Sequence, residues 1–220
     1  MEVSEEVLQA VVRHQGLRVV GMDDTDLASV DPSLLARLVA RMEEVGMRGT
    51  RLTVQQVEAV FNSICSGDSS RLKKLDISHN NLSTVSPVLL ASAVNSLQEG
   101  VLSHTQLTRE EGEAILTAIT SGDSRLKILN ISGNNLSKVD PGLLASAVNR
   151  LEEVEVEVEV WVGGYRWNTR LTVEQVEAIL TQSLVKTSLR RLEMRGVRGL
   201  DEDLVARASL AIGQLDVWSQ

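Results

Sequence analysis

Apolar residues recur along the chain in a short pattern that repeats many times. Residues 72–82 and 126–136 show it most fully, because both follow the order L-x-x-L-x-L-x-x-N-x-L. The first apolar residues of each segment alternate with polar ones, as in a β-strand with one buried side. The same frame begins at residues 17, 42, 72, 97, 126, 151, 189 and 212, more loosely in the last three. The pattern predicts one short strand per unit, about eight in all.

A stretch that favours a helix follows each predicted strand. All 3 prolines stand at the same place in every second unit, in the pairs Asp31-Pro32, Ser86-Pro87 and Asp140-Pro141. A capping residue followed by proline is typical of a helix N-terminus. The intervening units begin their helices at Thr53, Thr108 and Thr172. Glu111 and Gln175 complete capping boxes with the last two threonines. Gly67 and Gly122 are expected to end two of these helices in a left-handed turn.

The asparagine of the repeat has a predicted role in stacking. Asn80 and Asn134 stand where the chain turns out of the strand. An amide that points inward there can bond the backbone of the neighbouring unit. Thr25, Thr50 and Thr105 occupy the same place in other units and are expected to do part of this with a hydroxyl.

A unit of strand, turn and helix has too little apolar surface to fold alone, so the units are expected to stack. Shorter and longer units alternate, which gives a full period of about 55 residues. The prediction is a right-handed α/β solenoid with a parallel concave sheet and convex helices. Residues 1–16 are expected to form an N-terminal helical cap, with Ser4 as its capping residue. The solenoid is expected over 17–217, followed by a tail at 218–220.

Two alternating unit types, each with a full helix, resemble the ribonuclease-inhibitor class of leucine-rich repeats over about residues 17–217. These units are shorter than is usual in that class. The class also forms the C-terminal sensor arrays of cytosolic NOD-like innate immune receptors. The resemblance implies a non-enzymatic protein-recognition module, in the first place the ligand-sensing region of such a receptor. The alternative is a stand-alone regulatory solenoid, either an inhibitor or a scaffold that activates a small GTPase.

Composition narrows the range of partners and settings. The net charge of −8 is a poor match for nucleic acid or anionic lipid, so we expect neither as a partner. The sequence has no apolar run long enough to cross a membrane. The single cysteine, Cys65, has no internal partner for a disulfide, and this favours a cytoplasmic setting. Its thiol is expected to be half-buried near a helix end.

The sequence contains no motif that indicates catalysis. It has no glycine-rich phosphate loop, nucleophile elbow or H-E-x-x-H sequence, so we expect neither an enzyme nor a cofactor. His79 and His104 occupy the same place in adjacent units, and parallel stacking would put them side by side. Two imidazoles without a recurring carboxylate or thiolate make a weak metal site. We therefore favour a solvated loop position over a metal site.

Charges at the start of the predicted strands alternate in sign from unit to unit. Short units are basic after their first apolar residue, and long units are acidic there: Arg18, Lys73-Lys74, Lys127 and Arg190-Arg191 against Glu43-Glu44, Gln98-Glu99 and Glu152-Glu153. Neutralisation between neighbouring strands is the favoured interpretation, and a charged groove that binds a partner is the other. On the concave face, the predicted partner-binding residues are Lys74, Asp76, Asn130 and Glu155.

An insertion at about residues 154–168 interrupts the repeat. Valine and glutamate alternate strictly there, and Gly163-Gly164 is a typical two-residue hairpin turn. A β-hairpin is therefore predicted, with Trp161, Tyr165, Arg166 and Trp167 as candidate partner-binding residues, since Trp and Tyr are favoured at interfaces. Packing of these aromatic residues against the solenoid and a local duplication without a role are the alternatives.

The last predicted strand contains Leu215, Val217 and Trp218 and has no helix after it. An open strand edge invites pairing with another chain. Two explanations are expected: the chain is cut from a longer protein, or a second copy covers the edge and makes a homodimer.

Overall fold

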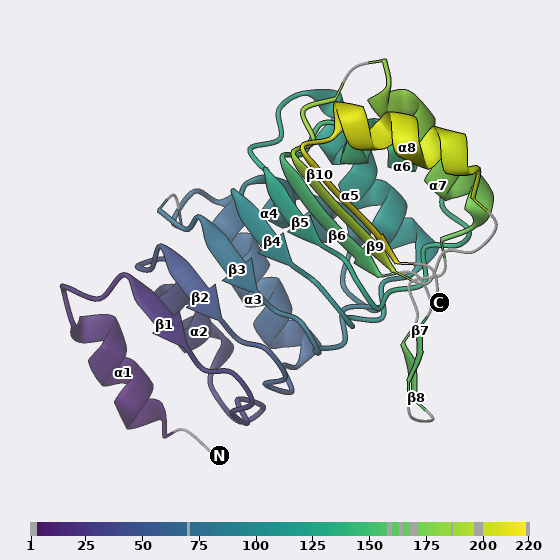
Figure 1. The fold of residues 1–220 in the computed structure, drawn as a ribbon. Helices are drawn as coiled ribbons and strands as arrows, with labels where there is room; N and C mark the ends of the chain where they lie inside the picture. The colour runs from purple at the N-terminus through teal and green to yellow at the C-terminus, as the bar shows by residue number, and fades with distance from the viewer. Residues whose placement is uncertain are drawn as a thin grey trace.

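The chain forms a curved stack of strand–helix units around one parallel sheet (Figure 1). The computed structural model describes residues 4–69, 71–157, 160–162, 165–167, 171–185, 187–195 and 200–218. The side chains of strand residues 155–157, 160–162, 165–167, 193–195 and 216–218 lie outside this description. All the structural statements below concern the described residues.

Eight strands make up the sheet, in the order β1-β2-β3-β4-β5-β6-β9-β10. They are β1 (Val19–Gly21), β2 (Glu44–Gly46), β3 (Lys74–Asp76), β4 (Glu99–Val101), β5 (Ile128–Asn130), β6 (Glu153–Glu157), β9 (Arg191–Arg195) and β10 (Gln214–Trp218). Every neighbouring pair in this sheet is parallel. Each strand begins two residues after a unit start read from the sequence, so the predicted strands and their direction are confirmed.

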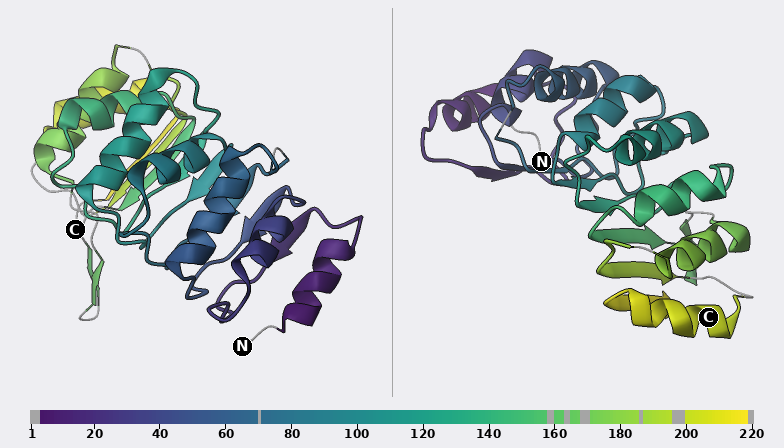
Figure 2. Two further views of the ribbon diagram at one scale, coloured as in Figure 1. Left: turned by 180° about the vertical axis from the view of Figure 1, so that it is seen from behind. Right: turned by 90° about the horizontal axis from the view of Figure 1, so that it is seen from above.

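Helices cover one face of the sheet. They are α1 (Glu5–Arg13), α2 (Pro32–Val39), α3 (Val54–Cys65), α4 (Pro87–Asn95), α5 (Arg109–Ser121), α6 (Pro141–Val148), α7 (Val173–Ser183) and α8 (Glu202–Ala211). Figure 2 shows these helices on the outer side of an arc and the strands on its inner side. Helices pack about 8–10 Å apart and strands about 4.8 Å apart, so the stack bends toward the sheet.

The core lies between the sheet and the helices and is almost entirely aliphatic. The second residue of the central strands points into it, as Leu75, Leu129 and Val154 do with 1%, 1% and 2% exposure. Burial of one such side chain stabilises the fold by about 1.5–3 kcal/mol. Phe61 of α3 is also completely buried. Stacking therefore buries the apolar side that a single unit would leave in water.

Asparagine joins neighbouring units as the sequence predicted. The amide of Asn134 donates to the Leu102 carbonyl of the preceding unit at 2.8 Å. Its oxygen accepts the backbone N–H groups of Thr105 at 3.1 Å and Leu107 at 3.0 Å. Asn80 makes the equivalent contacts one period earlier, to the Met47 carbonyl and the Leu52 N–H. Both asparagines are buried, so these bonds are shielded from water.

Threonine hydroxyls contribute to the contacts between neighbouring units at two of the three predicted positions. The buried hydroxyls of Thr50 and Thr105 lie 3.4 and 3.3 Å from the side-chain oxygens of Asn80 and Asn134 in the next unit. They also contact the Met47 and Leu102 carbonyls of their own units, both at 2.7 Å. Thr25 lies partly exposed, and its hydroxyl contacts only the Asp23 carbonyl of its own unit at 3.5 Å. The prediction for Thr25 was therefore wrong, because its hydroxyl does not bridge to a neighbouring unit.

Most of the predicted helix boundaries are confirmed. The Asp31 carboxylate accepts the N–H groups of Ser33 and Leu34, and that of Asp140 accepts the Leu143 N–H. Ser86 occupies the same place but makes no side-chain capping bond, and neither does Ser4 before α1. Both serines are therefore the N-cap residues that the sequence predicts, but their hydroxyls do not accept a backbone N–H.

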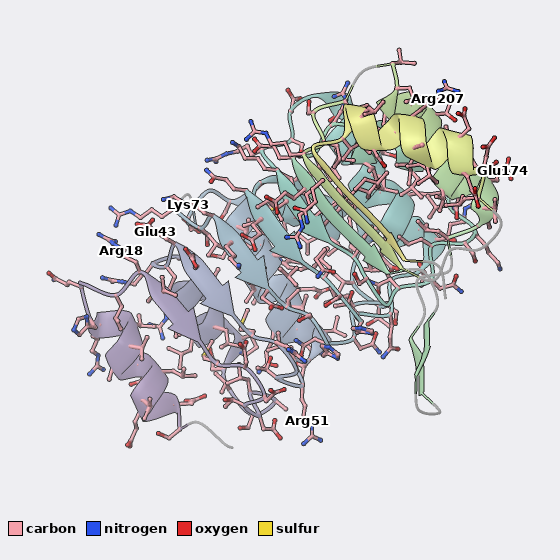
Figure 3. The ribbon with its side chains drawn as sticks, viewed as in Figure 1. Arg18, Glu43, Arg51, Lys73, Glu174 and Arg207 are labelled. Carbon is pink, nitrogen blue, oxygen red and sulfur yellow. The ribbon has the colours of Figure 1, made fainter. Side chains whose placement is uncertain are left out.

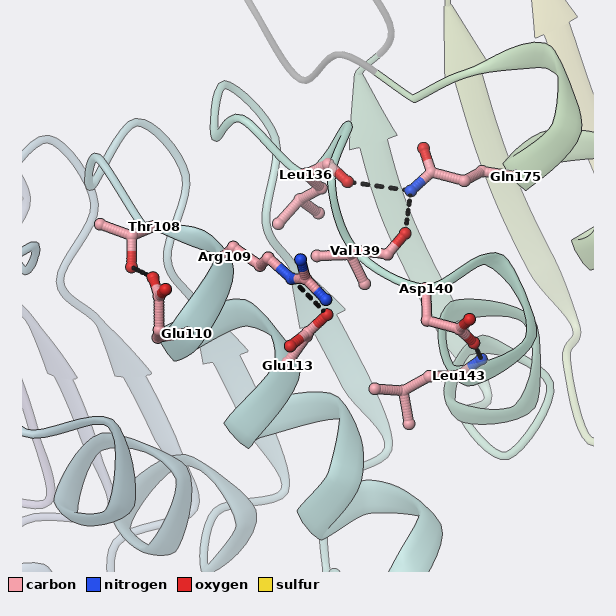
Figure 4. A network of polar contacts seen from close by, with 9 residues as sticks. All are labelled: Thr108, Arg109, Glu110, Glu113, Leu136, Val139, Asp140, Leu143 and Gln175. Carbon is pink, nitrogen blue, oxygen red and sulfur yellow. Dashed lines mark hydrogen bonds and ion pairs between the residues drawn. The ribbon is translucent and has the colours of Figure 1, made fainter.

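The helices of the long units are fastened to the preceding unit by buried glutamines (Figure 4). The Gln175 amide donates to the carbonyls of Leu136 at 2.9 Å and Val139 at 2.6 Å. Its side-chain oxygen accepts the Thr172 N–H, which completes the predicted capping box. Gln56 makes the same contacts in α3. Gly67 and Gly122 follow α3 and α5 with φ of +85° and +101°, as expected for left-handed helix ends.

Strands β7 (Val160–Val162) and β8 (Tyr165–Trp167) form a separate two-stranded antiparallel sheet. Val162 pairs with Tyr165, which leaves two residues to connect the strands. Figure 1 shows this pair projecting away from the main sheet, at the end where the strands of the sheet point. It falls within the stretch for which valine–glutamate alternation predicts a hairpin.

Candidate interaction surface

The concave face of the sheet carries the first and third residues of each three-residue strand. Lys74 and Asp76 of β3 lie on this face and are partly exposed. Asn130 stands at the third position of β5 and is in register with Glu155 of β6, whose side chain lies outside the described residues. The predicted concave residues therefore share one face, but they lie on three strands that are not all adjacent.

The polar groups of this face mostly contact one another. The Lys74 ammonium pairs with the Glu99 carboxylate of β4 at 2.5 Å. The Asp76 carboxylate accepts the backbone N–H of Ser78 at 2.9 Å, and Asn130 accepts that of Ser132 at 3.0 Å. A partner on this face would meet side chains that the fold already holds in place.

Ion pairs follow the edge where the strands begin, with the alternation of sign that the sequence predicted. The Glu43 carboxylate lies 2.7 Å from the Lys73 ammonium and 3.7 Å from the Arg18 guanidinium. Figure 3 shows these three side chains together over the starts of β1 to β3. At the other end of the sheet, Glu152 lies 3.1 Å from Lys127 and 4.0 Å from Arg190. Neutralisation between strands, the favoured interpretation, is thus the arrangement observed.

These pairs shift the ionisation of their members. The hydrogen bond and charge of Lys73 lower the pKa of the Glu43 carboxyl, and Lys127 lowers the pKa of Glu152 in the same way. The hydrogen bond to Glu99 raises the pKa of the Lys74 ammonium. Each of these shifts favours the charged form of Glu43, Glu152 or Lys74, so the ion pairs stabilise the alternation of sign.

His79 and His104 stack as their equivalent places in adjacent units predicted. Their ring centroids lie 4.6 Å apart, with 24° between the ring planes. Burial lowers the pKa of both imidazoles, and the pKa of His104 is lowered further by His79 and Arg48. A Cβ on Gly133 would lie 2.1 Å from the His104 ring, so this glycine leaves room for the stack. Rings that lie face to face do not converge on one metal ion, and the described residues hold no group of three ligands around one.

Cys65 is the last residue of α3 and is exposed. The expectation of a half-buried thiol was therefore wrong, because Ile64 rather than Cys65 takes the inward position at this helix end. Partial desolvation still raises the pKa of the thiol, which disfavours the reactive thiolate.

The hairpin and the final strand were the other predicted contact regions. Trp161 pairs with Arg166 and Val160 with Trp167 in the β7–β8 backbone register. The side chains of Trp161, Tyr165, Arg166 and Trp167 lie outside the described residues, so their packing stays a prediction.

Strand β10 stands at one end of the sheet and pairs with β9 alone among the described strands. Leu215 is partly buried against the core, whereas the side chains of Val217 and Trp218 are outside the described residues. The predicted self-association edge therefore lies at the outermost strand of the described sheet.

Comparisons with known proteins give this architecture a name. The Leucine Rich Repeat family model matches residues 71–93 and 125–147. The leucine-rich-repeat-containing protein LegL7 of Legionella pneumophila superposes with a TM-score of 0.54 at 14% identity, over 96% of this chain and 68% of its own. An internalin of Listeria monocytogenes gives 0.57 at 16% identity, over 96% of this chain and 50% of its own. The fold is a leucine-rich-repeat solenoid.

Leucine-rich-repeat solenoids generally serve as protein-interaction modules with extended concave surfaces. This chain spans half the length of the internalin that it matches. A search of curated protein sequences finds no significant match. None of the helices that the structure describes has the length and apolar character needed to span a bilayer.

One feature of this solenoid escaped the sequence analysis. Arginine directly precedes the first buried apolar residue in half of the units, at Arg41, Arg71, Arg125 and Arg150, and all four are exposed. A cavity of about 240 Å³ lies beside the first two and is lined by His14, Gln15, Leu17, Arg18, Ala40, Arg41 and Arg71. The signal was present in the repeat, since position 41 aligns with position 71. The sequence did not indicate a shared feature, because each of these arginines alone is typical of an ordinary turn.

Proposed function

We propose that this chain is a non-enzymatic protein-recognition module that binds its partner along the concave sheet and the β7–β8 hairpin. The leucine-rich-repeat fold supports this function, because stacked units hold a broad surface rigidly over many residues. The observation that carries the proposal is the concave face of β3 to β5, where partly exposed side chains are held in place by contacts such as the Lys74–Glu99 ion pair.

The hairpin adds the aromatic part of the proposed surface. Trp161, Tyr165 and Trp167 make up three of the five Trp, Tyr and Phe residues of the chain. Their strands leave the sheet beside the ends of β6 and β9, next to the concave face (Figure 1). Trp and Tyr often dominate the binding energy of protein interfaces. We propose that these residues, with Arg166, anchor a partner whose remaining length lies on the sheet.

Within this function we propose the ligand-sensing region of a cytosolic innate immune receptor. The support is the resemblance of the alternating units to the ribonuclease-inhibitor class, which such receptors use. The second candidate is a regulatory solenoid that inhibits an enzyme or activates a small GTPase. A panel of small GTPases tests the second candidate: addition of the chain should leave their GTP hydrolysis rates unchanged. A rise of tenfold or more for one GTPase would favour the scaffold.

The experiment for the main proposal compares binding of intact and altered chains to proteins that the intact chain captures. One variant replaces Trp161, Tyr165 and Trp167 by alanine, and a second replaces Lys74 by glutamate on the concave face. A convex control replaces exposed Arg207 of α8 by glutamate. We expect the first two variants to weaken binding of the same partner at least tenfold and the control to leave it unchanged. Equal binding by all four chains would refute the proposed surface.

A further inference from the structure

Three arginines line the cavity between α1, α2 and the start of β3, on a chain with a net charge of −8. Arg18 comes from the loop before β1, Arg41 from the end of α2, and Arg71 from the loop before β3. Arg71 belongs to the unit after that of Arg18 and Arg41, so the stacking of the solenoid brings the three together. Among the described residues, no carboxylate lines this cavity.

One carboxylate lies close to this cluster. Glu43 is 2.7 Å from the Lys73 ammonium and 3.7 Å from the Arg18 guanidinium. The charges of Lys73, Arg18 and Arg71 all lower the pKa of the Glu43 carboxyl, so this single negative charge is shared among three cations. With Arg41 included, positive charge is in excess around the cavity.

The end of α2 explains only part of this cluster. Helix carbonyl groups favour a cation near a C-terminus, and Arg41 stands two residues after α2. This effect fades within a turn, so it does not account for Arg18 or Arg71. The Nδ1 atom of His14 accepts the Gly16 N–H at 3.2 Å, which leaves Nε2 as the donor of the ring. The lining thus offers donors from four side chains.

Size and charge together indicate the class of ligand. A volume of about 240 Å³ is smaller than the range of about 300–1,000 Å³ typical of small-molecule sites, but it admits the head of one side chain. Guanidinium forks match oxyanions in pairs of parallel hydrogen bonds. A phosphorylated side chain brings a charge of about −1.5 to −2 and three acceptor oxygens, whereas a carboxylate brings −1 and two. Three guanidinium groups match the phosphate better.

We propose that Arg18, Arg41 and Arg71 form a subsite for one phosphorylated side chain of the protein partner. The proposal rests on the function proposed above, because Arg18 also belongs to the ion-pair row that borders the concave sheet. Figure 3 shows Arg18 beside Glu43 and Lys73 where the strands begin, at the border of the sheet on which the partner is proposed to lie. The subsite makes recognition depend on phosphorylation of the partner.

The test uses the full chain and O-phosphoserine as the probe, followed by NMR of the arginine Nε–H and backbone amide groups. We expect saturable shifts at Arg41, Arg71 and Gly16, with affinity for phosphoserine at least tenfold above that for glutamate. Arg41→Gln/Arg71→Gln should reduce this affinity at least tenfold. The matched control, Arg125→Gln/Arg150→Gln, removes the same charge from the same repeat position elsewhere and should retain the affinity.

Three results would overturn the subsite: no saturable shift at Arg41 and Arg71, equal affinity for glutamate, or equal loss in the control variant. Sedimentation with phosphatidylserine vesicles forms another arm, and vesicle binding that depends on Arg41 and Arg71 would assign the cluster to a membrane instead. Phosphatase treatment of captured partners separates this proposal from the broader function. If the partners still bind after treatment, the phosphate subsite is refuted and the broader recognition function is not.

Discussion

Replacement of Glu111 by glutamine is expected to stabilise the solenoid. Glu111 occupies the place in α5 that Gln56 and Gln175 occupy in α3 and α7, and it is 4% exposed. Both glutamines donate their amide to two carbonyls of the preceding unit at 2.6–2.9 Å. In the unit before α5, the corresponding carbonyls belong to Leu82 and Val85. A carboxylate has no N–H to offer them.

The magnitude follows from the bonds gained and lost. Two hydrogen bonds of about 0.5–1.5 kcal/mol each would form to Leu82 and Val85. The Glu111 carboxylate now accepts the Thr108 N–H at 2.6 Å near the start of α5. Loss of its charge there would cost about 0.3–1 kcal/mol, although the amide oxygen keeps the bond. The net gain is about 1 kcal/mol, or about 2–4 °C in melting temperature for a chain of this size.

Urea and thermal unfolding, followed by circular dichroism, measure this change. The matched control is the reverse exchange, Gln175→Glu, which removes the donor from the Leu136 and Val139 carbonyls and should lower the melting temperature by at least as much. A neutral or destabilising Glu111→Gln, with Gln175→Glu also neutral, would refute the view that these amides fasten one unit to the next.

Three further outcomes follow from the contacts between units. Asn134→Ala should lower the free energy of unfolding in urea by about 3 kcal/mol, because the buried N–H and C=O groups that Asn134 bonds lose their partner. A loss below about 1 kcal/mol would count against the role of this asparagine in joining neighbouring units. Burial holds the pKa of His79 and His104 below the ordinary 6.5, so the unfolded state takes up protons first as the pH falls below that value. Stability should therefore drop between pH 7.5 and 5.5, and His79→Gln/His104→Gln should flatten that drop; identical pH curves would contradict the burial effect. A double-mutant cycle on Lys74 and Glu99 should give a coupling of about 0–1 kcal/mol that shrinks with salt, whereas a salt-independent value would be inconsistent with partly exposed ions.

The fold could be predicted from the repeat because the same arrangement of buried apolar and hydrogen-bonding positions recurs from unit to unit. Leu75 and Leu129 occupy equivalent inward places, and Asn80 and Asn134 bond equivalent carbonyls. A single strand of three residues would have been too short to recognise. Eight copies in one frame are enough to predict the strands, their order and the stacking of His79 on His104.

Features that depend on one side chain were harder to predict. Ser86 shares its place with Asp31 and Asp140, yet its hydroxyl makes no capping bond. The exposure of Cys65 depends on which of two adjacent residues faces inward at the end of α3.

The Arg18–Arg41–Arg71 cluster depends on contacts between stacked units. The pattern within one unit does not predict such a site, because Arg18 and Arg41 stand at opposite ends of their unit and Arg71 lies in the next. The net charge of −8 describes the chain as a whole and does not reveal a local excess of positive charge.

Lysine footprinting of the chain with and without its partner tests the central claim most directly. Lys73, Lys74 and Lys127 lie along the concave side where the strands begin, and exposed Lys138 lies beyond the opposite ends of the strands, before α6. If the solenoid binds its partner on the concave side, acetylation of Lys73, Lys74 and Lys127 should fall in the complex. Unchanged acetylation of these three lysines, whatever happens at Lys138, would contradict the account.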